Sequence, residues 1–121
     1  MTGPFTCLIT GAASGIGAAL ARRLAGPGLH LVLHTRKNQA GLEAVAAAAT
    51  TSGSQTSLVY GDLSEQGACE AAVLACAGKL DWLVSNAGFS NNKRIADLTS
   101  DAVRQQHAGI TDAFFQLIRN A

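Results

Sequence analysis

Charge is scarce in this sequence. Only 14% of its 121 residues are Asp, Glu, Lys or Arg, and the formal net charge at pH 7 is +1. Nucleic-acid binding usually needs a broad basic field, and no basic cluster here exceeds two neighbours, as at Arg22-Arg23 and Arg36-Lys37. We therefore do not expect nucleic acid to be a partner.

Long apolar runs are also missing. The longest purely apolar stretches, such as residues 44–49, fall far short of the roughly 20 residues that a membrane-spanning helix requires. Residues 1–10 carry no positive charge ahead of their short apolar run and no Arg-rich amphipathic pattern, so they predict neither a secretory nor a mitochondrial signal. We expect no membrane partner.

Cysteine is too sparse and too irregular to hold this chain together. The three cysteines, Cys7, Cys69 and Cys76, are an odd number, and their spacing matches neither a disulfide framework nor a zinc motif. The sequence therefore predicts no metal site, and free thiols fit best with a reducing, cytoplasmic location. A chain of this length can form a core without disulfides, so we expect residues 1–121 to be one globular domain.

Four short apolar runs alternate with four longer, Ala-rich segments. The runs end at glycine or at polar residues and are typical of buried strands, whereas the longer segments have helical composition. Strands that alternate with helices of this length imply right-handed crossovers and a parallel sheet with helices on both faces, the α/β class. The expected strands are 5–10, 31–33, 57–60 and 80–85, and the expected helices are 15–26, 38–51, 65–77 and about 100 to the end.

Two of the expected helices carry apolar stripes. Cys69 and Cys76 belong to a stripe with steps of three and four residues, which predicts that both are core residues. The last helix carries a similar stripe that must pack on something, made of Val103, His107, Ile110, Phe114 and Leu117.

The junction between the first strand and the first helix is rich in glycine. It reads Thr10-Gly11-Ala12-Ala13-Ser14-Gly15-Ile16-Gly17. Gly11 permits a sharp turn, Gly15 lets the backbone approach a pyrophosphate, and Gly17 allows close packing of helix on strand. The N–H groups at the start of the helix then face the anion, so this turn is a candidate phosphate site.

This junction resembles the cofactor turn of the short-chain dehydrogenase/reductase family, T-G-x-x-x-G-x-G, at every fixed position. Two further segments match that family in order: Asp62-Leu63 after the third strand, and Asn86-Ala87-Gly88 after the fourth, where Ser85 replaces the family's first Asn. The resemblance implies a Rossmann-like sheet in the order 3-2-1-4, of which this chain holds the first half. It further implies a dinucleotide site that includes Gly11, Ala13, Ser14, Gly15, Ile16, Gly17, Asp62, Leu63, Asn86, Ala87 and Gly88.

Two of these residues have simpler alternatives. The family uses the residue at Asp62 near the adenine ring, but Asp after Gly is also common in turns, where it could cap the helix that begins near Ser64. Asn86 lines the cofactor in the family, yet it could equally be a turn residue that bridges backbone groups. The second role of Asn86 is compatible with the first.

The end of the second strand indicates which dinucleotide binds. An acidic residue there would accept hydrogen bonds from the ribose hydroxyls and repel a 2′-phosphate, whereas Thr35 followed by Arg36 leaves the position neutral to positive. This favours NADP(H) over NAD(H). The alternative is that Arg36 and Lys37 are only solvated residues at a strand end.

The catalytic residues of the family cannot be placed. Its proton donor belongs to a Tyr-x-x-x-Lys motif, but Tyr60 is the only tyrosine and Ser64 stands where the Lys would be. Gly109 occupies the place of the family's catalytic Asn, and His107 on the apolar stripe is expected to be a core or interface histidine. We assign no catalytic residue and expect the catalytic second half beyond Ala121.

The sequence thus supports two functions. The first is the NADP(H)-binding portion of a short-chain oxidoreductase, which in a complete family member transfers hydride between the nicotinamide and a carbonyl or alcohol. The alternative is a catalytically inactive, stand-alone module that binds a nucleotide or assembles with itself. A half sheet leaves its fourth strand as an edge, so we expect a homodimer through residues 80–85 or 103–117.

Overall fold

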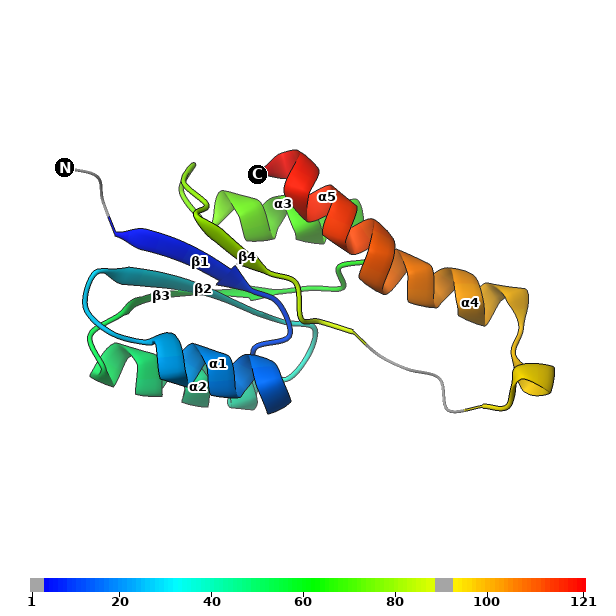
Figure 1. Ribbon diagram of the computed structural model, residues 1–121, viewed down its shortest axis with the longest axis horizontal. Helices are drawn as coiled ribbons and strands as arrows, with labels where there is room; N and C mark the ends of the chain where they lie inside the picture. Colours follow the sequence, from blue (N-terminus) through cyan, green and yellow to red (C-terminus); the bar gives the residue numbers. More distant parts are fainter. Residues whose placement is uncertain (1–3, 89–92) are drawn as a thin grey trace.

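Strands and helices alternate along the chain, as the composition predicts (Figure 1). The structure is a computed structural model that describes residues 4–88 and 93–121. The strands are β1 (Phe5–Ile9), β2 (Leu29–Thr35), β3 (Gln55–Tyr60) and β4 (Trp82–Val84). The helices are α1 (Gly15–Leu24), α2 (Gln39–Thr51), α3 (Gln66–Leu74), α4 (Ser100–His107) and α5 (Ala113–Asn120), with a short 3-10 helix at Ile95–Asp97.

The four strands form one parallel sheet in the order β3-β2-β1-β4, which confirms the predicted Rossmann-like order 3-2-1-4. Leu8 of β1 is in register with Val32 of β2 on one side and with Leu83 of β4 on the other. Because the strands are parallel, their carboxyl ends meet at one edge, which lies to the right in Figure 1. The glycine-rich junction and the ends of β2, β3 and β4 therefore come together.

Helices cover both faces of the sheet (Figure 1). Alternate residues of β1 point to opposite faces: Cys7 and Ile9 pack with α1 and α2, whereas Leu8 packs with α3 and α5. In the second of these clusters Cys69, Cys76 and Leu117 are buried, as their spacing predicts. Burial raises the pKa of Cys7 to about 11, helped by the neighbouring Cys76, and burial also raises the pKa of Cys76 to about 11. Both thiols stay protonated at neutral pH.

The sequence predicts one helix from about residue 100 to the end of the chain, but the structure shows an interrupted one. Residues 100–120 form α4 and α5 separated by one π-helical turn, Ala108–Asp112, in which the extra residue rotates one helix relative to the other. As a result the predicted stripe does not stay on one buried face: Leu117 is buried, but Val103 and Phe114 are 42% and 47% exposed. His107 is exposed, so it is not a core histidine, and its expected place at an interface stays a prediction.

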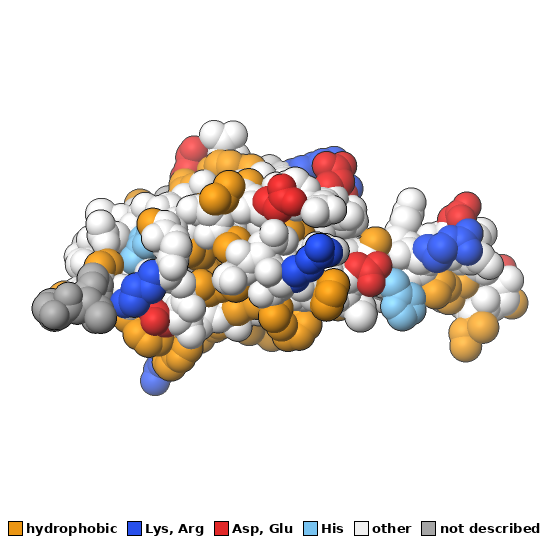
Figure 2. All heavy atoms as spheres, turned by 90° about the horizontal axis from the view of Figure 1, so that it is seen from above, with side chains coloured by type: hydrophobic (Ala, Val, Ile, Leu, Met, Phe, Trp, Pro, Cys, Tyr) orange, Lys and Arg blue, Asp and Glu red, His pale blue; other side chains and the backbone are white. Residues whose placement is uncertain are grey.

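Helix α4 projects from the body of the domain, and none of its residues is buried (Figure 1). Seen from the side of α3 and α5, apolar atoms are exposed over the body and along the projection (Figure 2). Phe115 and Ile118 of α5 are 59% and 51% exposed. Within the described residues, no helix combines the length and the apolar character needed to cross a membrane.

Candidate functional site at the carboxyl edge of the sheet

The glycine-rich junction links β1 to α1 and has the geometry of a ligand-facing turn. Gly17 cannot carry a side chain, because a Cβ there would lie 2.3 Å from the Gly11 carbonyl oxygen. Gly15 has φ +56° and nothing within 4 Å of its Cβ position, so its backbone faces open space. Ser14 makes no capping hydrogen bond with its side chain, and the first N–H groups of α1 stay available to an anion.

Thr10 joins this turn to the segment after β4. Its buried hydroxyl accepts hydrogen bonds from the N–H groups of Asn86 and Ala87, both at 3.0 Å. The Asn86 amide Nδ2 donates to the Gly11 carbonyl at 3.1 Å, so Asn86 does bridge backbone groups. The sequence pattern alone predicts no separate role for Thr10 beyond its place in the motif. A threonine at the end of a buried strand needs partners for its hydroxyl, and this requirement was the available signal.

His34 is a second residue that the sequence analysis missed. Its imidazole Nδ1 accepts the Gly11 N–H at 3.2 Å, and its Nε2 lies 2.8 Å from the Gly61 carbonyl oxygen. Burial lowers the pKa of His34 below its usual value of 6.5, which the bond to Gly61 and the nearby Asp62 carboxylate oppose. His34 is 2% exposed, so both of its ring nitrogens need hydrogen-bond partners within the fold.

A cavity of about 200 Å³ lies between these segments. Seven predicted site residues line it, from the glycine turn, the end of β2 and the loops after β3 and β4. They are Gly11, Thr35, Arg36, Asp62, Leu63, Ala87 and Gly88. His34, Gly61 and Gly109 complete the lining. The remaining predicted residues, which are Ala13, Ser14, Gly15, Ile16, Gly17 and Asn86, belong to the same turn and to the same β4 loop but do not line this cavity.

The mouth of the cavity carries charges of both signs. Arg36 Nη2 lies 3.6 Å from Asp62 Oδ2, and the two side chains are 59% and 36% exposed. Asp62 Oδ1 accepts hydrogen bonds from the N–H and the hydroxyl of Ser64, and these bonds, with Arg36 and Lys37, hold the pKa of Asp62 below its usual value. Asp62 is therefore an ionised acceptor that also orders the turn before α3, which begins at Gln66 rather than near Ser64.

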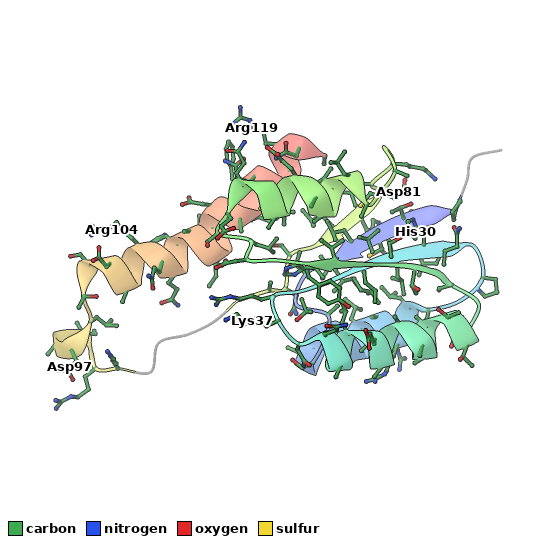
Figure 3. All side chains as sticks on the ribbon, turned by 180° about the vertical axis from the view of Figure 1, so that it is seen from behind. His30, Lys37, Asp81, Asp97, Arg104 and Arg119 are labelled. Carbon is green, nitrogen blue, oxygen red and sulfur yellow. The ribbon has the colours of Figure 1, made fainter. Side chains whose placement is uncertain are left out.

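Strand β2, which ends just before Arg36, carries no acidic residue. Thr35 is buried, and Lys37 follows Arg36 at the end of β2 (Figure 3). The cavity thus offers a hydroxyl, a guanidinium and an ionised carboxylate beside a phosphate-compatible turn. This donor and acceptor set fits the adenosine part of a dinucleotide.

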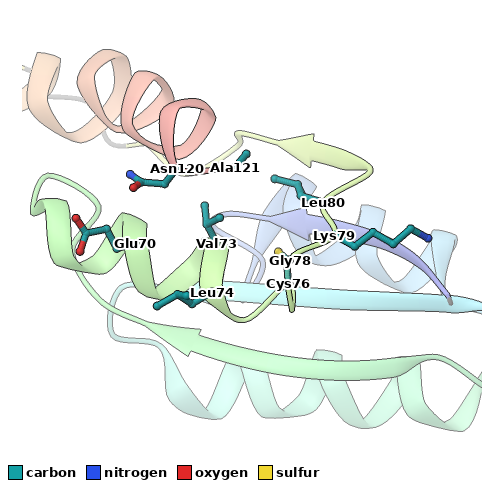
Figure 4. A pocket seen from close by; sticks show the side chains of 9 residues that line it. All are labelled: Glu70, Val73, Leu74, Cys76, Gly78, Lys79, Leu80, Asn120 and Ala121. Atoms are coloured by element: carbon teal, nitrogen blue, oxygen red, sulfur yellow. The ribbon is translucent and has the colours of Figure 1, made fainter. Parts of the chain in front are cut away.

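A larger cavity, of about 610 Å³, lies elsewhere in the fold (Figure 4). It is bounded by α3, the loop before β4 and the end of α5, and it contains none of the predicted site residues. Its lining is mostly apolar, with Glu70 and Lys79 as the charged members. The predicted site residues therefore gather at the smaller of these two cavities and not at the larger one.

Among the described residues that line the smaller cavity there is neither a tyrosine nor a lysine. Tyr60 lies on β3 and is 42% exposed, while Gly109 reaches the cavity from the π-helical turn without a side chain. Within residues 4–88 and 93–121, no three His, Cys, Asp or Glu residues are grouped so that they could hold a metal ion.

Comparisons with known proteins agree with the family resemblance seen in the sequence. A family model described as short chain dehydrogenase matches residues 6–121. An uncharacterized oxidoreductase of Methylorubrum extorquens is 37% identical over 102 residues, which are 81% of this chain and 41% of that protein. The solved 3-oxoacyl (acyl-carrier-protein) reductase of Agrobacterium tumefaciens with NADP bound is 33% identical at TM-score 0.86, over 98% of this chain and 46% of that one.

A short chain dehydrogenase of Burkholderia cenocepacia, solved in complex with NADP, is 31% identical at TM-score 0.90. The match covers 97% of this chain and 49% of that one. The chain therefore spans half, or somewhat less, of the length of these relatives.

Proposed function

Because the chain belongs to the short-chain dehydrogenase/reductase family, we propose that the carboxyl edge of its sheet binds NADP(H) in preference to NAD(H). The observation that carries this proposal is the meeting of Gly11, Arg36 and Asp62, from three separate segments, around one cavity. These segments are 25 to 26 residues apart in sequence, and only the parallel order of the sheet brings them together.

The preference for NADP(H) rests on the charges at the end of β2. A 2′-phosphate carries close to two negative charges at neutral pH and is best matched by a guanidinium, which can donate two parallel hydrogen bonds. Arg36 is exposed enough to turn toward such a group, and Thr35 places no carboxylate against it. The relatives solved with NADP support the choice of cofactor class but do not decide between the two dinucleotides.

Each predicted site residue has a part in the proposed complex. The turn would hold the pyrophosphate through Gly11, Ala13, Ser14, Gly15, Ile16 and Gly17. Asp62 and Leu63 would contact the adenine, with the Asp62 carboxylate accepting from its amino group. The β4 segment would line the cofactor toward the nicotinamide through Asn86, Ala87 and Gly88.

We propose that the complete protein is an oxidoreductase in which the bound nicotinamide exchanges hydride with a carbonyl or alcohol. The 121 residues contain no Tyr-x-x-x-Lys motif, and Tyr60, at the end of β3, does not line the cavity. Turnover would therefore need a second half of the domain to supply the proton donor. We place that protein in the cytoplasm, because its three described cysteines are buried free thiols.

The alternative is a module that binds a nucleotide without catalysis and assembles with itself. Within the described residues β4 pairs on one side only, with β1, and α5 exposes Phe114, Phe115 and Ile118. We propose a homodimer through β4 or through α4 and α5. Sedimentation that shows a folded monomer at high micromolar concentration would exclude this assembly.

Isothermal titration of the 121-residue chain with NADPH and then with NADH tests the proposed cofactor. We expect saturable binding of both, with NADPH bound more tightly. Equal affinities would contradict the preference for NADP(H). A folded chain that binds neither at millimolar concentration would contradict the nucleotide site itself, with folding checked by circular dichroism on the same sample.

A further inference from the structure

The His34 ring makes hydrogen bonds to two of the segments that line the smaller cavity. Its ring Nδ1 accepts the Gly11 N–H in the glycine turn, and its Nε2 lies 2.8 Å from the carbonyl oxygen of Gly61, which precedes Asp62. Its backbone carbonyl also accepts the Ala12 N–H at 2.7 Å. One residue thus fixes two successive peptide groups of the turn and the first peptide group of the β3 loop.

These contacts determine the protonation state of the ring. A backbone N–H can only donate, so Nδ1 must be the unprotonated nitrogen, and Nε2 then carries the proton that is donated to Gly61. The imidazole is consequently neutral and in a single tautomer. A second proton would have to sit on Nδ1, where it would face the Gly11 N–H donor, and the bond to the turn would be lost.

Both of the joined segments depend on glycine. Gly11 has φ +65° and Gly61 has φ +151°, which are conformations that glycine adopts readily. Neither residue has a side chain that could hold its backbone in place by packing. The Asn86 side chain, in the loop after β4, donates to the Gly11 carbonyl, whereas the Gly11 N–H is held by His34. Removing the imidazole would therefore release the turn relative to the β3 loop.

We propose that neutral His34 is a positioning residue that joins the glycine turn to the β3 loop and thereby sets the affinity of the site for a dinucleotide. This inference rests on the proposed function. A dinucleotide that places its pyrophosphate on the turn and its adenine beside Asp62 needs the two segments at a fixed separation. His34 fixes that separation before the ligand arrives, which lowers the ordering cost of binding.

The charged groups around the ring are few. Asp62 faces it from the β3 loop, and Arg36 lies just after the end of its own strand. The cavity residues contributed by the glycine turn, the β4 loop and the π-helical turn carry no titratable side chain. Burial lowers the pKa of His34, and the Asp62 carboxylate opposes this shift. The ring stays neutral through the physiological range, and affinity should decline as the pH falls below about 6.5 toward the pKa of the folded protein.

The test uses three substitutions at His34. His34→Phe keeps a buried ring but removes both hydrogen bonds. His34→Asn places its carbonyl oxygen near the former Nδ1, so that it can still accept from Gly11, and His34→Gln places its amide nitrogen near the former Nε2, so that it can still donate to Gly61. The matched control is His30→Phe, because His30 lies at the opposite end of β2 and its ring also makes one hydrogen bond, to Ser57 Oγ at 2.8 Å (Figure 3).

NADPH binding is measured by titration from about pH 7.5 to about pH 5, and folding of each variant by urea denaturation. We expect His34→Phe to weaken binding about tenfold or more at neutral pH, with partial recovery in His34→Asn and His34→Gln, and no change in His30→Phe. The ratio of the dissociation constants of variant and wild type should approach one as the pH falls. The 2′-phosphate of the ligand also titrates in this range, but it is common to both proteins and cancels in the ratio.

The outcomes separate the two proposals. Suppose that the wild type binds NADPH and that the folded His34→Asn and His34→Gln variants bind it with the same affinity and the same pH profile. This result would overturn the positioning role and leave the nucleotide site intact. An unchanged NADPH affinity in a folded His34→Phe variant would overturn the positioning role directly. Absence of NADPH binding by folded wild type would overturn the proposed function, and the role of His34 with it.

Discussion

The substitution Arg36→Asp tests the electrostatic argument for NADP(H). It replaces the guanidinium at the mouth of the cavity by a carboxylate, and it does so beside Asp62, whose Oδ2 lies 3.6 Å from Arg36 Nη2. The change removes the cation that would pair with a 2′-phosphate and introduces an anion that would repel it. An acidic residue here can also accept hydrogen bonds from the ribose hydroxyls of NADH.

The size of the effect follows from two contributions. Hydrogen bonds between charged groups are worth about 1.5–3 kcal/mol, and solvent screening of the 59% exposed Arg36 side chain places the loss near the lower value. Repulsion between a carboxylate and a nearly doubly charged phosphate about 4 Å away adds about 1.5 kcal/mol at the dielectric constant of water. The sum of about 3 kcal/mol corresponds to a loss of NADPH affinity on the order of 100-fold.

NADH lacks the 2′-phosphate, so its affinity should change by less than about threefold or improve. The assay is calorimetric titration of both cofactors at low ionic strength, repeated at high salt, where the difference should shrink. Lys37→Asp is the control, because it makes the same change of charge one residue further on, outside the cavity lining. Equal losses for the two cofactors, or the same NADPH loss in the control, would refute the reasoning.

Three further predictions concern stability, measured by urea or thermal unfolding. Gly17→Ala should destabilise the fold by about 1–3 kcal/mol, because its Cβ would meet the Gly11 carbonyl at 2.3 Å; an unchanged midpoint would contradict this contact. Thr10→Val should cost about 1–3 kcal/mol, because the part-buried Ala87 N–H loses its acceptor and the Asn86 N–H keeps only the Val84 carbonyl, whereas Thr10→Ser should retain most of the stability; equal losses in both would argue for packing instead. Stability should fall as the pH drops below about 6.5, since burial lowers the pKa of His30 and His34 and the unfolded chain then binds more protons; a melting temperature that stays constant down to about pH 5 would contradict it.

Much of the fold could be predicted because its signals are local. Alternating strands and Ala-rich helices predict a parallel α/β sheet, and the spacing of Gly11, Gly15 and Gly17 identifies the turn from neighbouring residues alone. The positions of Arg36 and Asp62 at one cavity also follow, because the carboxyl ends of parallel strands share one edge. These inferences need only the order of the elements.

Other features of the fold and of the site depend on three-dimensional contacts that the spacing of residue types along the chain does not reveal. The π-helical turn at Ala108–Asp112 inserts one residue into a stripe with steps of three and four, and such a stripe carries no mark of the insertion. The contacts of His34 with Gly11 and Gly61 span 23 and 27 residues and depend on the register of β2 against both neighbours. From the sequence, His34 is only one more residue at a strand end.

The central claim is that the carboxyl edge of the sheet, and not the larger cavity beside α3, holds the cofactor. The most direct test is a two-dimensional NMR titration of the labelled 121-residue chain with NADPH, which follows each backbone amide. The account predicts saturable shifts at Gly11, Gly15, Arg36 and Asp62. Shifts confined to the lining of the larger cavity, such as Glu70 and Leu80, or no shifts at millimolar NADPH, would contradict it.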